Sequence, residues 1–206
     1  MFTVLTDSRC GSHMLRSLLN SHPQLHCYDE ILGNKKDDKN FWHLKGHEGC
    51  LVSYANLIEG GRFAKHGYDI PKIIEKIKSS PVIHLTRDVT ERAKSQLVHG
   101  RASRQLKIFK SANLEEPASI APKYENFNPE DIKRTCAMFL RRQEQGLALF
   151  EDQSAWLELS YEWLCGNYEL KELSTHKSSM ICEHLQVPVT RLACSLYKIR
   201  KYTTST

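Results

Sequence analysis

Residues 2–20 read FTVLTDSRCGSHMLRSLLN and give the clearest indication of how this chain begins to fold. Their first part, Phe2–Thr6, is a short apolar and β-branched run of the kind that forms a buried strand. A polar turn follows at residues 7–12, and residues 13–20 then place leucines at helical spacing on one face. We therefore expect a strand, a tight turn and a helix, which is the usual first unit of an α/β domain.

Later segments repeat this alternation of strands and helices. Residues 81–86, PVIHLT, are the clearest strand, and Asp88 with Glu91 has the capping-box spacing that opens a helix ending near Gly100. The other predicted elements are a short strand at 62–66, a helix at Pro71 behind an Asp69 cap, a long helix behind an Asn128 cap, a strand at 156–160 and a helix at 175–185. Residues 33–49 and 101–128 are expected to be irregular excursions.

This order of elements predicts a single three-layer α/β domain with a mainly parallel sheet over residues 1–206. The net charge of +5 suits an anionic small molecule and is too small for a dedicated nucleic-acid binder. No apolar run approaches the ~20 residues of a membrane helix, so no membrane span is expected. Seven cysteines, an odd number with no CxxC pair, favour a reducing cytoplasm.

One segment resembles a metal site. HLKGHEGC contains His43, His47 and Cys50, but two glycines interrupt any helix there and no second ligand pair matches it. A surface loop is the favoured interpretation, and no metal site is expected.

The turn after the first strand is a candidate anion site. Such a turn directs backbone N–H groups and the helix dipole at one point, and Arg9 and Ser12 add a positive charge and a hydroxyl donor. The alternative is a polar turn in which Ser12 caps the helix. The segment is not a Walker A loop, because Gly11 is followed by Ser12 and His13 without a lysine, and this disfavours an ATP or GTP hydrolase.

A second candidate anion site follows the strand at 81–86. Arg87 stands at the end of that strand, and Ser95 lies eight residues later, two turns into the next helix. Both side chains can reach one phosphate. Taken singly, each has a plainer interpretation, as an arginine at the sheet edge or an exposed helical serine.

Taken together, the two units resemble the sulfotransferases that use 3′-phosphoadenosine-5′-phosphosulfate (PAPS), and most closely the bacterial trehalose-type branch. Residues 8–23, SRCGSHMLRSLLNSHP, are similar to the family's 5′-phosphosulfate loop, and residues 84–87 with Ser95 are similar to its 3′-phosphate motif. Residues 160–164 and 180–185 match two later segments. The resemblance implies a P-loop-kinase-like sulfotransferase fold and transfer of a sulfuryl group, without a metal, to a hydroxyl of a carbohydrate or other small molecule.

The resemblance also implies the roles of individual residues. The nucleotide-binding residues that it implies are Arg9, Cys10, Gly11, Ser12, His13, Met14, Arg87, Ser95 and Arg200. It places the catalytic base at Glu30, beyond the first helix, with Arg9 and His13 also at the reacting group. His13 and His47 stay open as alternative bases, because imidazole titrates near neutral pH.

The acceptor is left open as a sugar, a lipid headgroup or a phenol, and a homodimer is possible. Residues 33–60 and 101–128 are expected to line its pocket, since loops beyond the strand ends supply specificity in open α/β sheets. Two other functions stay open: a nucleotide or small-molecule kinase of the related fold, and a nucleotide-binding relative without catalytic activity.

Overall fold

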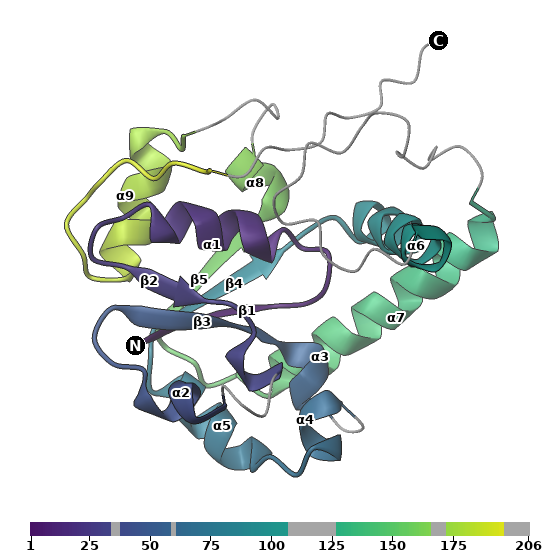
Figure 1. Ribbon diagram of the computed structural model, residues 1–206, viewed down its shortest axis with the longest axis horizontal. Coiled ribbons are helices and arrows are strands. Elements are labelled where there is room, and N and C mark those ends of the chain that lie inside the picture. Colours follow the sequence, from purple (N-terminus) through teal and green to yellow (C-terminus); the bar gives the residue numbers. More distant parts are fainter. Residues whose placement is uncertain (34–37, 59–60, 107–126, 166–171, 196–206) are drawn as a thin grey trace.

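The computed structural model describes residues 1–33, 38–58, 61–106, 127–165 and 172–195. Its centre is a five-stranded parallel sheet in the order β2-β3-β1-β4-β5 (Figure 1). The strands are β1 (Phe2–Thr6), β2 (His26–Tyr28), β3 (Glu48–Ser53), β4 (Val82–Thr86) and β5 (Trp156–Ser160). The helices are α1 (Ser12–Asn20), α2 (Asp38–His43), α3 (Tyr54–Leu57), α4 (Arg62–Lys65), α5 (Ile70–Lys78), α6 (Val89–Leu106), α7 (Pro129–Ala148), α8 (Tyr161–Cys165) and α9 (Thr175–His184), with a 3-10 turn, η1 (Ile31–Gly33).

The N-terminal strand occupies the middle of the sheet. Val4 of β1 pairs with Leu51 of β3 on one side and with Ile83 of β4 on the other. Along the chain, β1 is followed by β2 at one edge of the sheet and then by β3, which lies between β2 and β1; β4 and β5 are added afterwards on the other side of β1. Ligands of open parallel sheets bind beyond the carboxyl ends of the strands where the direction of building reverses. Here that position is the edge formed by the loops after β1, β3 and β4.

Helices cover both faces of the sheet (Figure 1). Because side chains alternate along a strand, Phe2 and Val4 pack with the buried leucines of α1 and with α8 and α9, whereas Leu5 packs with α2, α3 and α5 on the other face. These two apolar layers, one on each side of the sheet, confirm the predicted three-layer α/β fold. Among the described residues, no helix combines the length and hydropathy of a membrane span.

The predicted helix starts are confirmed by their caps. The Asp69 carboxylate accepts a hydrogen bond from the Lys72 amide, and the Asn128 side chain accepts one from the Glu130 amide. The Asp88 carboxylate accepts from the Glu91 amide at 2.9 Å. Each cap satisfies one of the backbone N–H groups that a helix start leaves without a partner.

Two predictions of local structure were wrong: the irregular segment at 33–49 and the short strand at 62–66. Residues 33–49 contain α2 and the start of β3, and Cys50 is buried in β3 instead of lying on a surface loop. A strand buried on both faces has no alternation of polar and apolar residues, so β3 gave no period-two pattern. In place of the strand predicted at 62–66, residues 62–65 form the helix α4, in which Phe63 is the buried apolar side chain.

The helix expected to end near Gly100 extends further. It continues as α6 to Leu106, because one glycine inside a helix costs only about 1 kcal/mol. The residues from 107 to 126 lie outside the described part of the chain.

Candidate active site

The loop between β1 and α1 has an unusual backbone. Arg9 and Gly11 both have positive φ angles, of 66° and 89°, in the left-handed region. Gly11 is the N-cap of α1 and makes no side-chain cap, so the alternative in which Ser12 caps the helix is wrong. Without a side-chain cap, amide N–H groups of the first turn of α1 stay available to an anion.

Glycine at position 11 is required by its surroundings as well as by its backbone. A Cβ atom there would lie 2.2 Å from Cδ2 of Tyr161, the first residue of α8. Only glycine therefore lets the loop and α8 approach this closely.

The structure brings together three of the predicted nucleotide-binding side chains. Nε of Arg9 donates a hydrogen bond to Oγ of Ser95 at 3.1 Å, and Nη1 of Arg87 donates to the Arg9 carbonyl at 3.2 Å. The three residues come from the β1 loop, the end of β4 and α6. Two guanidinium groups and a hydroxyl thus meet beside the N-terminus of α1, an arrangement suited to a ligand with more than one phosphate or sulfonate group.

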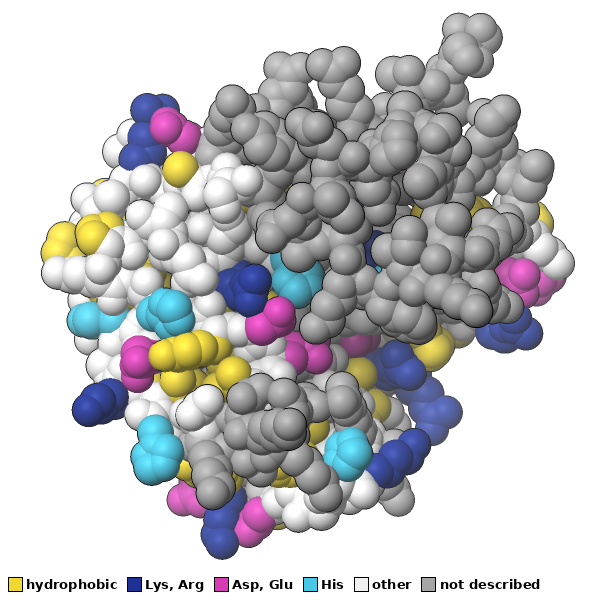
Figure 2. Space-filling model, viewed as in Figure 1, with side chains coloured by type: hydrophobic (Ala, Val, Ile, Leu, Met, Phe, Trp, Pro, Cys, Tyr) yellow, Lys and Arg dark blue, Asp and Glu magenta, His cyan; other side chains and the backbone are white. Residues whose placement is uncertain are grey.

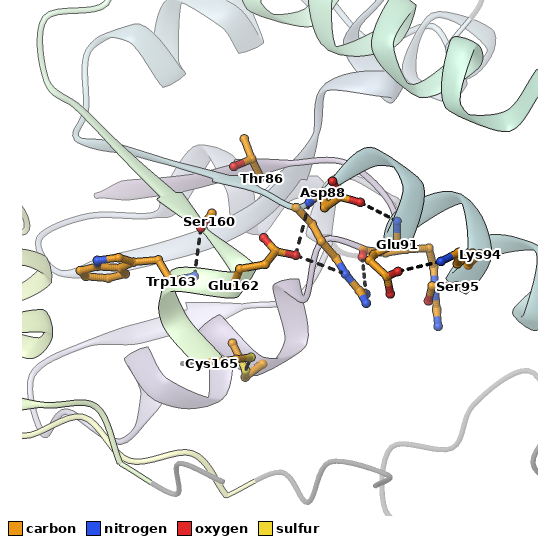
Figure 3. A network of polar contacts seen from close by, with 12 residues as sticks. Thr86, Asp88, Glu91, Lys94, Ser95, Ser160, Glu162, Trp163 and Cys165 are labelled. Carbon is orange, nitrogen blue, oxygen red and sulfur yellow. Dashed lines mark hydrogen bonds and ion pairs between the residues drawn. The ribbon is translucent and has the colours of Figure 1, made fainter. Parts of the chain in front are cut away.

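Arg87 is held by residues of α8 that sequence reasoning left without a role. Its guanidinium lies 4.5 Å from the centre of the Tyr161 ring, and its Nε lies 3.9 Å from the Glu162 carboxylate. The same Glu162 oxygen accepts from the Asp88 amide at 3.3 Å. Figure 3 shows Glu162 directed toward Asp88, which directly precedes α6, the helix that carries Glu91 and Ser95. These contacts fix Arg87 in one orientation before any ligand arrives.

A buried ion pair lies at the start of the loop between β1 and α1. Nη2 of Arg92 and Oδ2 of Asp7 lie 2.8 Å apart, and both side chains are 1% exposed. The other Asp7 oxygen accepts from the Ser8 amide at 2.7 Å and from the Ser53 hydroxyl at 3.4 Å. The Arg92 guanidinium also lies 4.0 Å from the centre of the Phe139 ring on α7. The pair was not predicted, although a carboxylate directly after a buried strand is a signal that could have indicated it.

Glu30 lies in the exposed turn after β2, next to a polar pocket. The pocket has a volume of about 340 Å³, which is within the range of small-molecule sites. It is lined by Asp7, Ser8, Glu30, Ser53, Ala55, Asn56, Gly61 and Arg142. Part of the expected acceptor segment 33–60 therefore lines it, with Arg142 of α7 as an unexpected contributor. The segment 107–126 lies outside the described residues.

The two alternative bases differ in position. His13 is at the start of α1 with its side chain 66% exposed, and its Nδ1 lies 3.9 Å from Oδ2 of Asp29, which Arg16 also contacts at 3.1 Å. In the space-filling view of Figure 2, carboxylates and basic side chains lie next to one another near the middle of the molecular face that the figure shows. His47 precedes β3, so it lies at the amino end of the parallel strands, opposite the edge that carries the site. It is therefore excluded as a base.

The other predicted residues of the loop point elsewhere. Cys10 is fully buried, and this burial raises the pKa of its thiol. The Met14 sulfur lies 3.4 Å from the Cys165 sulfur, within the apolar layer beside α8. Cys10 therefore offers a ligand its backbone amide and not its side chain. Arg200 lies outside the described residues.

Comparison with known proteins gives a match of structure and none of sequence. No protein-family model matches the chain, and no curated protein matches it. Among solved structures it is similar to a sulfotransferase from Alicyclobacillus acidocaldarius, with a TM-score of 0.53 and 13% sequence identity. The match covers 97% of this chain and 86% of the other. At this identity the likeness shows the fold, and the expected sulfotransferase-type α/β fold is confirmed.

Proposed function

We propose that this protein is a PAPS-dependent sulfotransferase of the trehalose-type branch, which transfers a sulfuryl group to a hydroxyl of a small-molecule acceptor. The observation that carries the proposal is the meeting of Arg9, Arg87 and Ser95 beside the uncapped N-terminus of α1. The likeness to a sulfotransferase along nearly the whole chain supports it, and also supports a single domain over residues 1–206.

The donor would be bound at both of its anionic ends. The amides of residues 10–13 and Arg9 would hold the 5′-phosphosulfate, and Arg87 with Ser95 would hold the 3′-phosphate. Because Arg87 already donates to the Arg9 carbonyl, the two halves of this site are coupled. The sulfonate carries a single negative charge, so one arginine and backbone amides are enough to stabilise its transition state without a metal.

The acceptor would enter through the pocket that Glu30 lines. In the transfer step the acceptor oxygen forms a bond to sulfur while the bond from sulfur to the 5′-phosphate oxygen breaks. The leaving adenosine 3′,5′-bisphosphate keeps that electron pair, and Glu30 takes the hydroxyl proton. His13, which faces Asp29 instead of the pocket, is the less favoured base.

The cytoplasm is the proposed compartment. All seven cysteines lie among the described residues and are free thiols, which supports a reducing environment.

Nucleotide binding tests the proposal. Adenosine 3′,5′-bisphosphate should bind about 10- to 100-fold more tightly than AMP, because loss of a charge-assisted contact costs about 1.5–3 kcal/mol. Isothermal titration calorimetry on the wild type and on Arg87→Gln measures this preference, which the variant should lose. Equal affinity for the two nucleotides in the wild type contradicts the proposal.

Removal of metal ions by EDTA distinguishes the proposed sulfotransferase from the kinase alternative. Release of adenosine 3′,5′-bisphosphate from PAPS, with a panel of hydroxylated acceptors, should be unchanged by EDTA. A kinase would instead consume ATP and require magnesium. Binding of the bisphosphate without transfer to any acceptor would favour the non-catalytic relative.

A further inference from the structure

The pocket beside the β1 loop has an unusually polar lining. Among the described residues that line it, six carry a hydroxyl, amide or charged side chain: Asp7, Ser8, Glu30, Ser53, Asn56 and Arg142. The other two described lining residues are Ala55 and Gly61. A bound phenol ring or acyl chain would remove these groups from water without replacing their hydrogen bonds, which costs free energy. The lining therefore favours an acceptor that is polar on most of its surface.

The charged residues of the pocket differ in how they are paired. Asp7 is neutralised from behind by Arg92, at 2.8 Å. Arg142 enters the pocket from α7 and is half-buried, yet within the described part of the chain it makes no hydrogen bond or ion pair. Arg134, on the same helix, is by contrast paired with Asp131 at 2.8 Å. A half-buried guanidinium that faces a pocket without a counter-ion favours a ligand that brings an anion.

We propose that the acceptor carries an anionic group in addition to the hydroxyl that is sulfated, and that Arg142 binds this group. The inference rests on the proposed function, because it takes this pocket as the acceptor site. The chemistry is an oxyanion that a guanidinium can bind through two hydrogen bonds: a carboxylate, a phosphate ester or a sulfate ester.

The arrangement also sets the orientation of such an acceptor. Glu30 and Arg142 line the same pocket from different elements, the turn after β2 and α7. The Glu30 carboxylate repels an anion, so the anionic group would face α7 and leave the hydroxyl toward Glu30 and the β1 loop. Specificity and proton removal would thus depend on different residues.

Direct binding of acceptor probes tests the inference without any need for turnover. Glucose, glucuronate and glucose 6-phosphate, which differ in their charged group, are titrated by calorimetry into protein saturated with adenosine 3′,5′-bisphosphate. At least one anionic probe should bind about 10- to 100-fold more tightly than glucose, the range for hydrogen bonds to charged groups. Arg142→Gln should lose this preference. Arg141→Gln, an exposed neighbour on the same helix, is the matched control and should keep it.

Transfer assays with the same probes distinguish the inference from the proposed function. Failure of every acceptor, charged or neutral, to release adenosine 3′,5′-bisphosphate from PAPS would count against the sulfotransferase, while the binding experiment would still decide the role of Arg142. Transfer to neutral acceptors with no gain for anionic ones, or an anion preference that survives in folded Arg142→Gln, overturns the inference. Arg142→Lys, which keeps the charge, should retain part of the preference and covers the case in which Arg142→Gln does not fold.

Discussion

Glu30 is exposed, lies in a turn, and lines the pocket proposed for the acceptor. Glu30→Gln keeps the size of the side chain and removes its basicity, so the transfer rate should fall by about 10²–10⁴-fold. Affinity for adenosine 3′,5′-bisphosphate and the melting temperature should hardly change, because the carboxylate would face the acceptor in the proposed mechanism and lies outside the core. Single-turnover kinetics with PAPS measure the rate. A folded variant that binds nucleotide and transfers at the parent rate would remove Glu30 from the mechanism, and His13 would be tested next.

His84 is a second residue whose behaviour can be measured. It is buried in β4 between the Tyr54 and Trp156 rings, and neither ring nitrogen has a hydrogen-bond partner among the described residues. Burial, and then the Arg92 charge, lower the pKa of His84 from 6.5 to about 4. The unfolded chain therefore binds this proton more tightly. Stability is retained above pH 6.5 and falls as the pH drops toward 4, by up to about 1.4 kcal/mol per pH unit.

His84→Leu should reduce this loss of stability in acid, and urea denaturation at pH 4.5, 5.5 and 7 measures it. His66→Gln, at an exposed histidine after α4, is the control and should keep the parent pH dependence. An unchanged slope in His84→Leu would mean that other groups cause the acid sensitivity.

At the scale of elements, the effect of a side chain in the β1–α1 loop can be tested at Gly11, with Gly67 after α4 as the control. Gly11 and Gly67 both have positive φ, but a Cβ atom would meet Tyr161 at Gly11 and nothing within 4 Å at Gly67. Alanine at either position should cost about 1–2 kcal/mol of stability from the backbone alone. Only Gly11→Ala must also displace α8, and with it the ring that supports Arg87. It should weaken binding of adenosine 3′,5′-bisphosphate at least about tenfold, whereas Gly67→Ala should leave calorimetric affinity unchanged.

The elements also show what the sequence could and could not predict. Arg87 and Ser95 were recognisable because a strand end and a helix fix their separation, and the structure places both beside Arg9. Strand β3 was missed because it is buried on both faces and begins with Glu48 and Gly49, which carry no strand signal. Arg142 was missed for another reason: it faces the pocket only through the packing of α7, which no local pattern encodes.

At the scale of the whole molecule, the Asp7–Arg92 pair connects β1, β3, α6 and α7. Arg92→Met would leave a buried carboxylate without its counter-charge, which costs about 3–5 kcal/mol. The double variant Asp7→Asn with Arg92→Met should recover part of that loss, since no uncompensated charge stays buried. Urea denaturation measures both. Equal stability of the single variant and the parent would mean that the pair contributes little to the fold.

The central place of β1 has a consequence for how the chain acquires its structure. Strand β1, which precedes the other strands of the sheet in the chain, pairs Thr3, Val4 and Leu5 with Val82, Ile83 and His84, and β5 adds the far edge only at residues 156–160. Until β4 is made, one side of this apolar strand has no neighbour, and pairing requires closure of a loop of roughly 80 residues. Parallel sheets with such distant pairings fold slowly and expose strand edges meanwhile. Nascent or refolding chains should therefore be prone to aggregate at β1, the strand that leads into the proposed anion-binding loop.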